Sequence, residues 1–134
     1  WRSVIRIRLR EEFEKHNFRV EFLNRVDELI LFRTLSEENY AEIARRMMAY
    51  HLKRLEKEKL ITVTPDPGVA PAIGEYCKAV NEGARPVLRL VQSMVVTPVV
   101  DFVLRGGYSL PVKVKVSAVL GGEGCEPLSK VELD

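Results

Sequence analysis

The stretch Glu82-Gly83-Ala84-Arg85-Pro86-Val87-Leu88-Arg89-Leu90-Val91-Gln92 opens the longest apolar segment of the chain. Gly83 frees the backbone for a turn, and Pro86 suits the first turn of a helix, where no backbone N–H is missed. From Val87 to Leu104 the residues are mostly Val, Leu, Met and Phe. The sequence therefore predicts a helix that is buried on more than one face.

Arg85 lies at the predicted start of this helix, where the helix dipole is positive and an anion is favoured. Leu88, Val91 and Val95 are expected to pack beneath it and to give it a rigid base. A cation presented in this way is suited to contact a phosphate group. The alternative is an arginine that is solvated or paired with a carboxylate.

Composition places the chain among ordinary globular proteins. It has 134 residues, of which 46% are hydrophobic and 30% are charged, and its net charge is +2. This length suits one domain, or one domain with an appended piece, and the charge is too small to indicate nucleic acid or a membrane. No apolar run is expected to reach the length of a membrane span. Because the sequence does not begin with Met, we expect it to be a fragment of a longer protein.

The cysteines and histidines indicate no metal site. Cys77 and Cys125 are far apart and form no ligand-type spacing, so free thiols in a reducing intracellular compartment are expected. His16 and His51 have no companion ligands nearby in the sequence. We therefore predict no metal.

Two short elements are expected before residue 34. The spacing of Ile5, Leu9 and Phe13 favours a helix, although the alternation of Ile5-Arg6-Ile7-Arg8-Leu9 also suits a strand. Asn17 can end this helix. The continuous apolar run Leu29–Phe32 predicts a strand buried on both faces.

The remainder predicts an α+β fold with helices packed on a small sheet. Ser36 can cap a helix whose apolar residues recur at helical spacing, and Asp66 can begin a shorter helix that ends near Val80. With the long apolar helix, these make three main helices. Three strands are expected to form the sheet: Leu60–Thr64, Leu110–Val119 and Leu128–Leu133.

Two separated motifs resemble Clp-type AAA+ ATPases. Gly83-Ala84-Arg85-Pro86, followed by Arg89, Gln92 and Pro98, is similar to the sensor 2 helix of that family. The stretch Phe18–Glu28 is similar to its Phe-Arg-Pro-Glu-Phe-Leu-Asn-Arg-Ile-Asp-Glu segment. The resemblance covers roughly Phe13 to Val116 and is closest to ClpB-type disaggregases. It implies a remnant of the AAA+ large subdomain at residues 1–33 and the small C-terminal (lid) subdomain at residues 34–134.

The same resemblance implies roles for particular residues. Arg25 matches the arginine finger, which acts in trans on ATP bound by a neighbouring subunit, and Arg19 is a secondary candidate. Arg85 matches the sensor 2 arginine, with Gly83 and Ala84 beside it in the cofactor-binding turn. The local alternative for Arg25 is a salt bridge with Asp27 or Glu28.

The family further implies ATP, with Mg in the full-length protein, a homo-hexamer, and unfolded or aggregated protein substrates. No Gly-x-x-x-x-Gly-Lys-Ser/Thr loop occurs in the sequence, so the fragment alone should neither hydrolyse ATP nor bind it tightly. Two departures from the family pattern are Val20, in place of a proline, and the shortened loop Val80-Asn81-Glu82 before Gly83.

Three alternatives stay open at this point. The parent protein could be a protease-coupled Clp unfoldase rather than a disaggregase. A basic nucleic-acid module, with helices and a hairpin carrying Lys113 and Lys115, comes from another class. A scaffold domain that has lost its nucleotide contacts is the third possibility.

Overall fold

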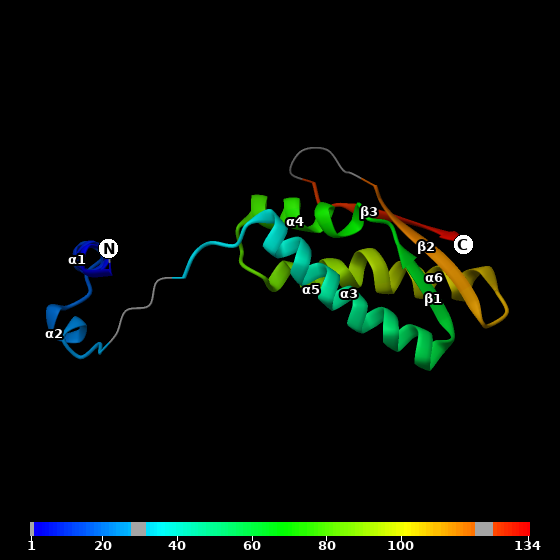
Figure 1. The fold of residues 1–134 in the computed structure, drawn as a ribbon, viewed down its shortest axis with the longest axis horizontal. Helices are drawn as coiled ribbons and strands as arrows, with labels where there is room; N and C mark the ends of the chain where they lie inside the picture. The colour runs from blue at the N-terminus through cyan, green and yellow to red at the C-terminus, as the bar shows by residue number, and fades with distance from the viewer. Residues whose placement is uncertain (1, 28–31, 120–124) are drawn as a thin grey trace. The chain divides into compact units, whose positions relative to one another are not determined.

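The computed structural model describes residues 2–27, 32–119 and 125–134, which form two compact units, residues 1–34 and residues 35–134 (Figure 1). This division lies next to the predicted boundary between residues 33 and 34. That residues 1–33 are a remnant of a large ATPase subdomain stays a prediction.

The first unit is helical in its described part. Helix α1 spans Arg2–Lys15 and helix α2 spans Val20–Leu23. Asn17 turns the chain between them with a positive φ of 65°, and the ring of Phe18 packs edge-on against that of Phe13 with centroids 5.2 Å apart. The helix predicted for this region is confirmed and its strand alternative is wrong. The strand predicted at 29–32 lies outside the described residues except for Phe32, which is exposed and in no regular element.

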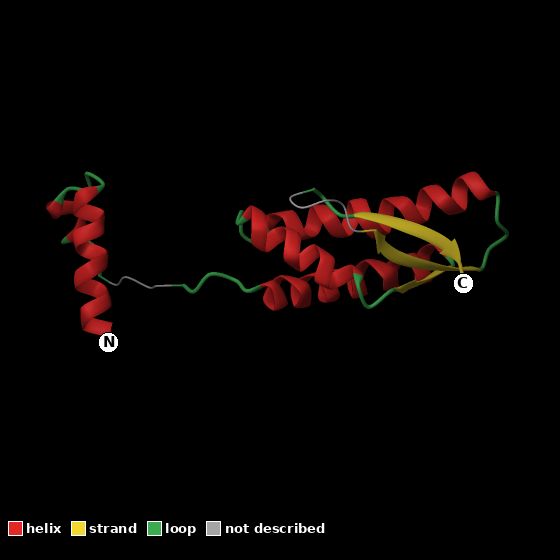
Figure 2. Cartoon of the chain, turned by 90° about the horizontal axis from the view of Figure 1, so that it is seen from above, coloured by secondary structure: helices red, strands yellow, loops and turns green. Residues whose placement is uncertain are grey.

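Three helical segments make up most of the second unit. Helix α3 spans Glu37–Lys59 and helix α4 spans Val69–Val80. The third is the long apolar helix, which consists of α5 (Arg85–Val91), the π-helical turn η1 (Gln92–Val96) and α6 (Thr97–Gly106). Figure 2 shows these helices beside a small sheet. The three predicted main helices are confirmed.

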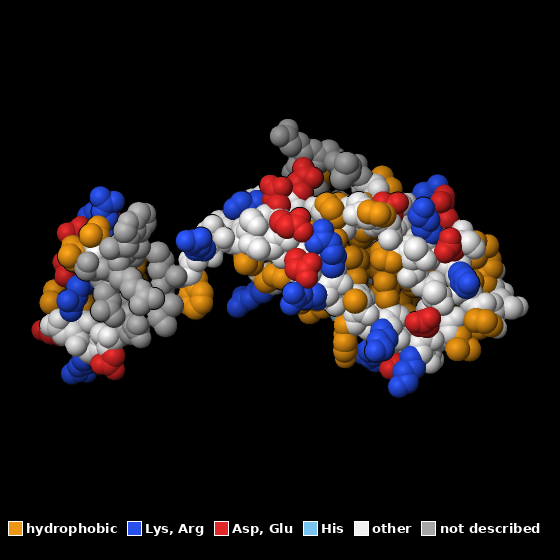
Figure 3. Space-filling view, in the orientation of Figure 1, with side chains coloured by type: hydrophobic (Ala, Val, Ile, Leu, Met, Phe, Trp, Pro, Cys, Tyr) orange, Lys and Arg blue, Asp and Glu red, His pale blue; other side chains and the backbone are white. Residues whose placement is uncertain are grey.

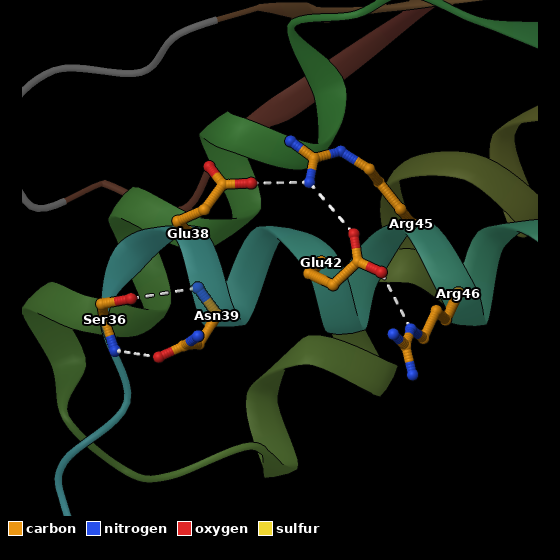
Figure 4. Close-up of polar contacts among 6 residues, drawn as sticks. All are labelled: Ser36, Glu38, Asn39, Glu42, Arg45 and Arg46. Carbon is orange, nitrogen blue, oxygen red and sulfur yellow. Dashed lines mark hydrogen bonds and ion pairs between the residues drawn. The ribbon is translucent and has the colours of Figure 1, made fainter.

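The start of α3 is fixed by its own side chains. Ser36 Oγ accepts a hydrogen bond from the backbone N–H of Asn39 at 3.2 Å, and Asn39 Oδ1 accepts one from the N–H of Ser36 at 3.1 Å (Figure 4). This reciprocal capping box satisfies backbone donors that have no partner within the helix. The predicted cap is confirmed.

The π-helical turn is a feature that the sequence did not predict. The N–H of Thr97 donates to the carbonyl of Gln92, five residues back, and Pro98 follows at once. Because proline has no N–H and crowds the carbonyl of the preceding turn, a regular α-helix cannot pass through it unchanged. One widened turn before Pro98 lets the long helix continue.

The sheet has three strands in the order β1-β2-β3. Strand β1 (Ile61–Pro65) pairs in parallel with β2 (Val112–Val119), and β2 pairs antiparallel with β3 (Leu128–Leu133). Alternate β2 residues face the helices, and Val112, Val114 and Val116 are buried. The predicted α+β class and all three strands of the second unit are confirmed.

The long helix supplies much of the core. Eight of its residues are buried: Pro86, Val87, Leu90, Val91, Met94, Val95, Val99 and Val103. The expectation for Leu88 is wrong, because this side chain is 42% exposed and its neighbour Val87 takes the buried position. The expectation that no apolar run reaches the length of a membrane span is also wrong. Arg85–Gly106 is a 22-residue helix, long and apolar enough to cross a membrane. Its buried face packs into this core, which accounts for the apolar composition.

Helices α3 and α4 pack closely because Gly74 has no side chain. A Cβ placed on Gly74 would lie 2.5 Å from the carbonyl oxygen of Glu37 and 3.2 Å from the Cβ of Ala41.

Candidate functional site

The candidate site begins in the turn between α4 and α5. Asn81 ends α4 in the left-handed conformation, with φ 55°, and Gly83 follows with φ 71°. Glycine adopts such angles without steric cost. Ala84 is then the N-cap of α5 and Arg85 its first residue. The shortened loop therefore still leads directly into the helix.

The Arg85 side chain is exposed, whereas the helix residues that support it are buried. Pro86 and Val87, which follow it, are buried, and Val91 and Val95 below them are fully buried. Within the described part of the chain, no ion pair involves the guanidinium of Arg85. The predicted geometry, a cation at the start of a packed helix, is observed; its role as a phosphate contact stays a prediction.

Arg89, one helical turn after Arg85, is engaged by a carboxylate. Its Nη1 donates to Glu126 Oε1 at 2.8 Å and to Oε2 at 2.9 Å. The hydrogen bond to Glu126, together with its charge, raises the pKa of Arg89 further above its ordinary value. Residues four apart lie on the same helix face. Of the two arginines on this face, only Arg89 has an acidic partner among the described residues.

Arg25 lies in the other unit, directly after α2. Its N–H donates to the carbonyl of Phe22 at 3.0 Å, and the preceding Asn24 accepts a hydrogen bond from Arg10 Nη2 at 2.7 Å. The Arg25 side chain is exposed, and no ion pair joins it to Asp27 in the described residues. Glu28, its other possible partner, lies outside the described residues. The structure does not bring Arg25 and Arg85 into one unit.

Arg19, the secondary candidate, is the N-cap of α2 and is exposed.

The groups that the candidate site presents can bind an anion. In the described ranges, no group of three His, Cys, Asp or Glu side chains could hold a metal ion. Cys77 and Cys125 are free thiols, and burial raises the pKa of the Cys77 thiol, which makes it a poor nucleophile. What the site presents is a guanidinium, a turn with positive φ and a helix start.

Sequence reasoning did not single out Glu126. It precedes β3 in a tail that resembles the family poorly, and 37 residues separate it from Arg89. No local pattern could have indicated this pairing, because it depends on the antiparallel pairing of β3 with β2, which brings a distant part of the chain back to the helix.

Comparison with known proteins gives the family. The family described as the C-terminal, D2-small domain of ClpB protein matches residues 35–116, which begin where the second unit begins. The rice mitochondrial chaperone protein ClpB3 is 33% identical over 125 residues, 91% of this chain and 12% of that protein. The rice chloroplastic ClpB2 is 36% identical over 91 residues, 68% of this chain and 9% of that protein.

A bacterial relative matches as well. ClpB of Mycoplasma genitalium is 31% identical over 104 residues, which are 73% of this chain and 14% of that protein. The chain thus spans about a tenth of the length of these curated relatives. The match covers α3, α4, the long helix and most of β2. The chain belongs to the ClpB D2-small domain family.

Proposed function

We propose that this chain is the C-terminal part of a ClpB-type protein-remodelling ATPase, in which Arg85 contacts the phosphates of ATP bound by the same subunit. One observation carries this proposal: Arg85 is exposed at the first position of the long helix, on a buried base, in a domain of the ClpB family. Movement of this rigid helix would couple the nucleotide to the angle of the small domain.

The residues present suit part of an ATP site. A guanidinium offers a planar fork of donors that matches phosphate oxygens, and the start of a helix favours an anion. The sequence contains no phosphate loop, so the remaining phosphate and magnesium contacts would come from elsewhere in the full-length protein. ATP supplies the free energy for remodelling when it is bound and hydrolysed.

The proposal gives Arg25 a separate role. As an arginine finger in trans, it would reach ATP bound by the neighbouring subunit of a homo-hexamer and stabilise charge that develops in the transition state. Its exposure after the short helix α2 suits a contact with another subunit.

Substrates and location are also part of the proposal. The relatives are named chaperones, and two of them are named chloroplastic and mitochondrial; unfolded or aggregated proteins inside a cell or organelle are the corresponding substrates. Free cysteines suit a reducing compartment. Disaggregation is preferred to a protease-coupled activity because the matched family is that of ClpB.

The surface favours this function over a nucleic-acid module. Figure 3 shows basic and acidic side chains interspersed over the visible face of the second unit. On the outer face of the sheet, Lys115 lies opposite Glu132 in the neighbouring strand. A surface of mixed sign lacks the basic stripe that duplex binding requires.

The test is Arg85→Ala in the full-length protein. We expect nucleotide affinity to fall, or nucleotide binding to lose its effect on the position of the small domain, while the melting temperature stays near that of the wild type. Isothermal titration with ATP and a thermal melt measure the two quantities. Arg85→Lys keeps the charge and removes the fork, so it should retain part of the affinity.

Arg105→Ala is the matched control. Arg105 lies at the other end of the same helix, is 81% exposed and is paired only with Asp101 among the described residues. Its loss should leave nucleotide affinity unchanged. If Arg85→Ala melts far below wild type while it binds ATP normally, Arg85 is a structural residue and the proposal is wrong.

A further inference from the structure

Strand β3 has one free edge in the described part of its unit. It pairs with β2 on one side, and no other described strand pairs with it. Its backbone is in the extended form, without proline, from Leu128 to Leu133. The sheet's opposite edge, β1, ends in Pro65, which cannot donate to a further strand.

The hydrogen bonds of β2 define which β3 groups face outward. The N–H of Val112 donates to Leu60 and the carbonyl of Val116 accepts from Asp66, so even-numbered β2 residues bond toward β1. Odd-numbered ones bond toward β3, as the bond from Asp134 N–H to the Lys113 carbonyl at 3.0 Å shows.

In two antiparallel strands, residues that lie opposite each other alternate between hydrogen-bonded and non-hydrogen-bonded pairs. Within the pairing of β2 with β3, the even-numbered β3 residues are therefore the bonded ones. The N–H and C=O groups of Ser129, Val131 and Leu133 point to the free edge.

We propose that this edge is a docking surface for a second copy of the chain, with the two β3 strands antiparallel and Val131 opposite its twin. In this register Ser129 faces Leu133 of the second copy, so all three outward-facing residues form bonded pairs. Lys130 faces Glu132 of the second copy, and Glu132 faces Lys130. Opposite charges directly across a strand pair are stabilising.

The charge pattern selects this register from its neighbours. A shift that places Lys130 opposite its twin sets two ammonium groups together, and the opposite shift sets two Glu132 carboxylates together. Like charges directly opposite each other are destabilising. Both side chains are exposed and form an ion pair within the strand, so they are available to exchange partners across a two-fold axis. Edge charges that would repel another strand thus become complementary in a self-pair.

The helix-facing side of β3 adds apolar surface. A shallow groove there is lined by Phe102 and Tyr108, whose rings stack with centroids 5.3 Å apart, and by Ser129 and Val131. Leu133 is 53% exposed. In the paired form Leu133 of the second copy lies beside Ser129, at this groove, and loses its contact with water.

This contact goes beyond the proposed ATPase role and does not depend on it. A two-fold contact uses the same patch on both chains, whereas neighbours in a ring meet through different patches. Pairing through β3 would therefore link subunits of different rings. Strand β3 also lies outside the residues 35–116 that match the family.

The experiment is sedimentation equilibrium of the 134-residue chain over a wide range of concentration. The wild type should dimerise with increasing concentration. Lys130→Glu places Glu opposite Glu at both symmetric pairs, and Glu132→Lys places Lys opposite Lys. Each variant alone should raise the dissociation constant of the dimer about tenfold, because two attractive charge pairs become repulsive. An equimolar mixture of the two variants should restore wild-type affinity, because every cross-strand pair in the mixed dimer is again opposite in charge.

Two further variants control for folding. Lys130→Glu combined with Glu132→Lys in one chain reverses both charges and should dimerise like the wild type. Lys113→Glu changes an exposed residue of the same sign on the central strand β2 and should have no effect. A wild type that stays monomeric overturns the proposal, as does a dimer that neither single variant weakens, or a mixture that fails to recover.

Discussion

The Nη1 atom of Arg89 donates to both carboxylate oxygens of Glu126, at 2.8 and 2.9 Å. This ion pair joins the first turns of the long helix to the segment that leads into β3. Arg85 lies one turn earlier on the same face of the helix. Glu126 therefore neutralises the arginine nearest to the candidate phosphate contact and leaves Arg85 as the cation presented at the helix start.

We expect Arg89→Ala and Glu126→Gln to show a small coupling in a double-mutant cycle. Both side chains are partly exposed, at 56% and 37%, and exposed pairs contribute roughly 0.2–1 kcal/mol to the free energy of unfolding. Urea unfolding of the two single variants and the double variant measures the coupling. It should shrink at high salt, because screening weakens exposed pairs; a coupling that salt does not change would contradict the assignment.

Most of the fold of the second unit could be predicted from its sequence because the signals there are local. The capping side chain of Ser36, the helical spacing of the apolar residues that follow it, and the strand predicted at Leu110–Val119 each depend on a few neighbouring residues. Leu88 was assigned to the wrong side of the helix, because an almost wholly apolar segment does not indicate which residues face the core.

The candidate site could be predicted only in part. The position of Arg85 follows from the local turn and helix signals and from the family motif. The partner of Arg89 is 37 residues away along the chain, and the π-helical turn before Pro98 depends on how the helix accommodates a missing N–H. Both depend on the three-dimensional path of the chain.

We expect Arg25→Ala in the full-length protein to lower ATP turnover sharply and to leave nucleotide affinity nearly intact. Arginine fingers of related phosphoryl-transfer enzymes contribute roughly 10³–10⁵ in rate. Steady-state phosphate release and equilibrium nucleotide binding separate the two effects.

Arg19→Ala changes an exposed arginine in the same segment; it is the control and should have the smaller effect. Mixing Arg25→Ala subunits with phosphate-loop variants should restore some activity if the residue acts in trans; wild-type turnover in Arg25→Ala would favour a local role.

We expect Gly74→Ala to destabilise the second unit, although alanine usually favours a helix over glycine by about 1 kcal/mol. The added methyl group would lie 2.5 Å from the Glu37 carbonyl oxygen, which is backbone and cannot rotate away. Helices α3 and α4 must then separate, at a cost of roughly 1–3 kcal/mol. Denaturant unfolding measures whether the substitution lowers or raises the free energy of unfolding. A variant more stable than the wild type would show that the helices do not pack this closely.

The last prediction contrasts two neighbouring apolar residues of the long helix. Val91→Asp should unfold the second unit, because Val91 is fully buried and an unpaired buried carboxylate costs several kcal/mol, a large part of the roughly 5–15 kcal/mol that stabilises a domain. Leu88→Asp changes a side chain that is 42% exposed, so it should cost about 1 kcal/mol or less. Circular dichroism melts of the two variants test the contrast directly. Both substitutions place the same charge in the same helix, and Leu and Val differ in helix propensity by less than about 0.7 kcal/mol, so a difference of several kcal/mol between the two variants reports burial. Equal melting temperatures would mean that the face of the helix assigned to the core is wrong, and with it the packed base beneath Arg85.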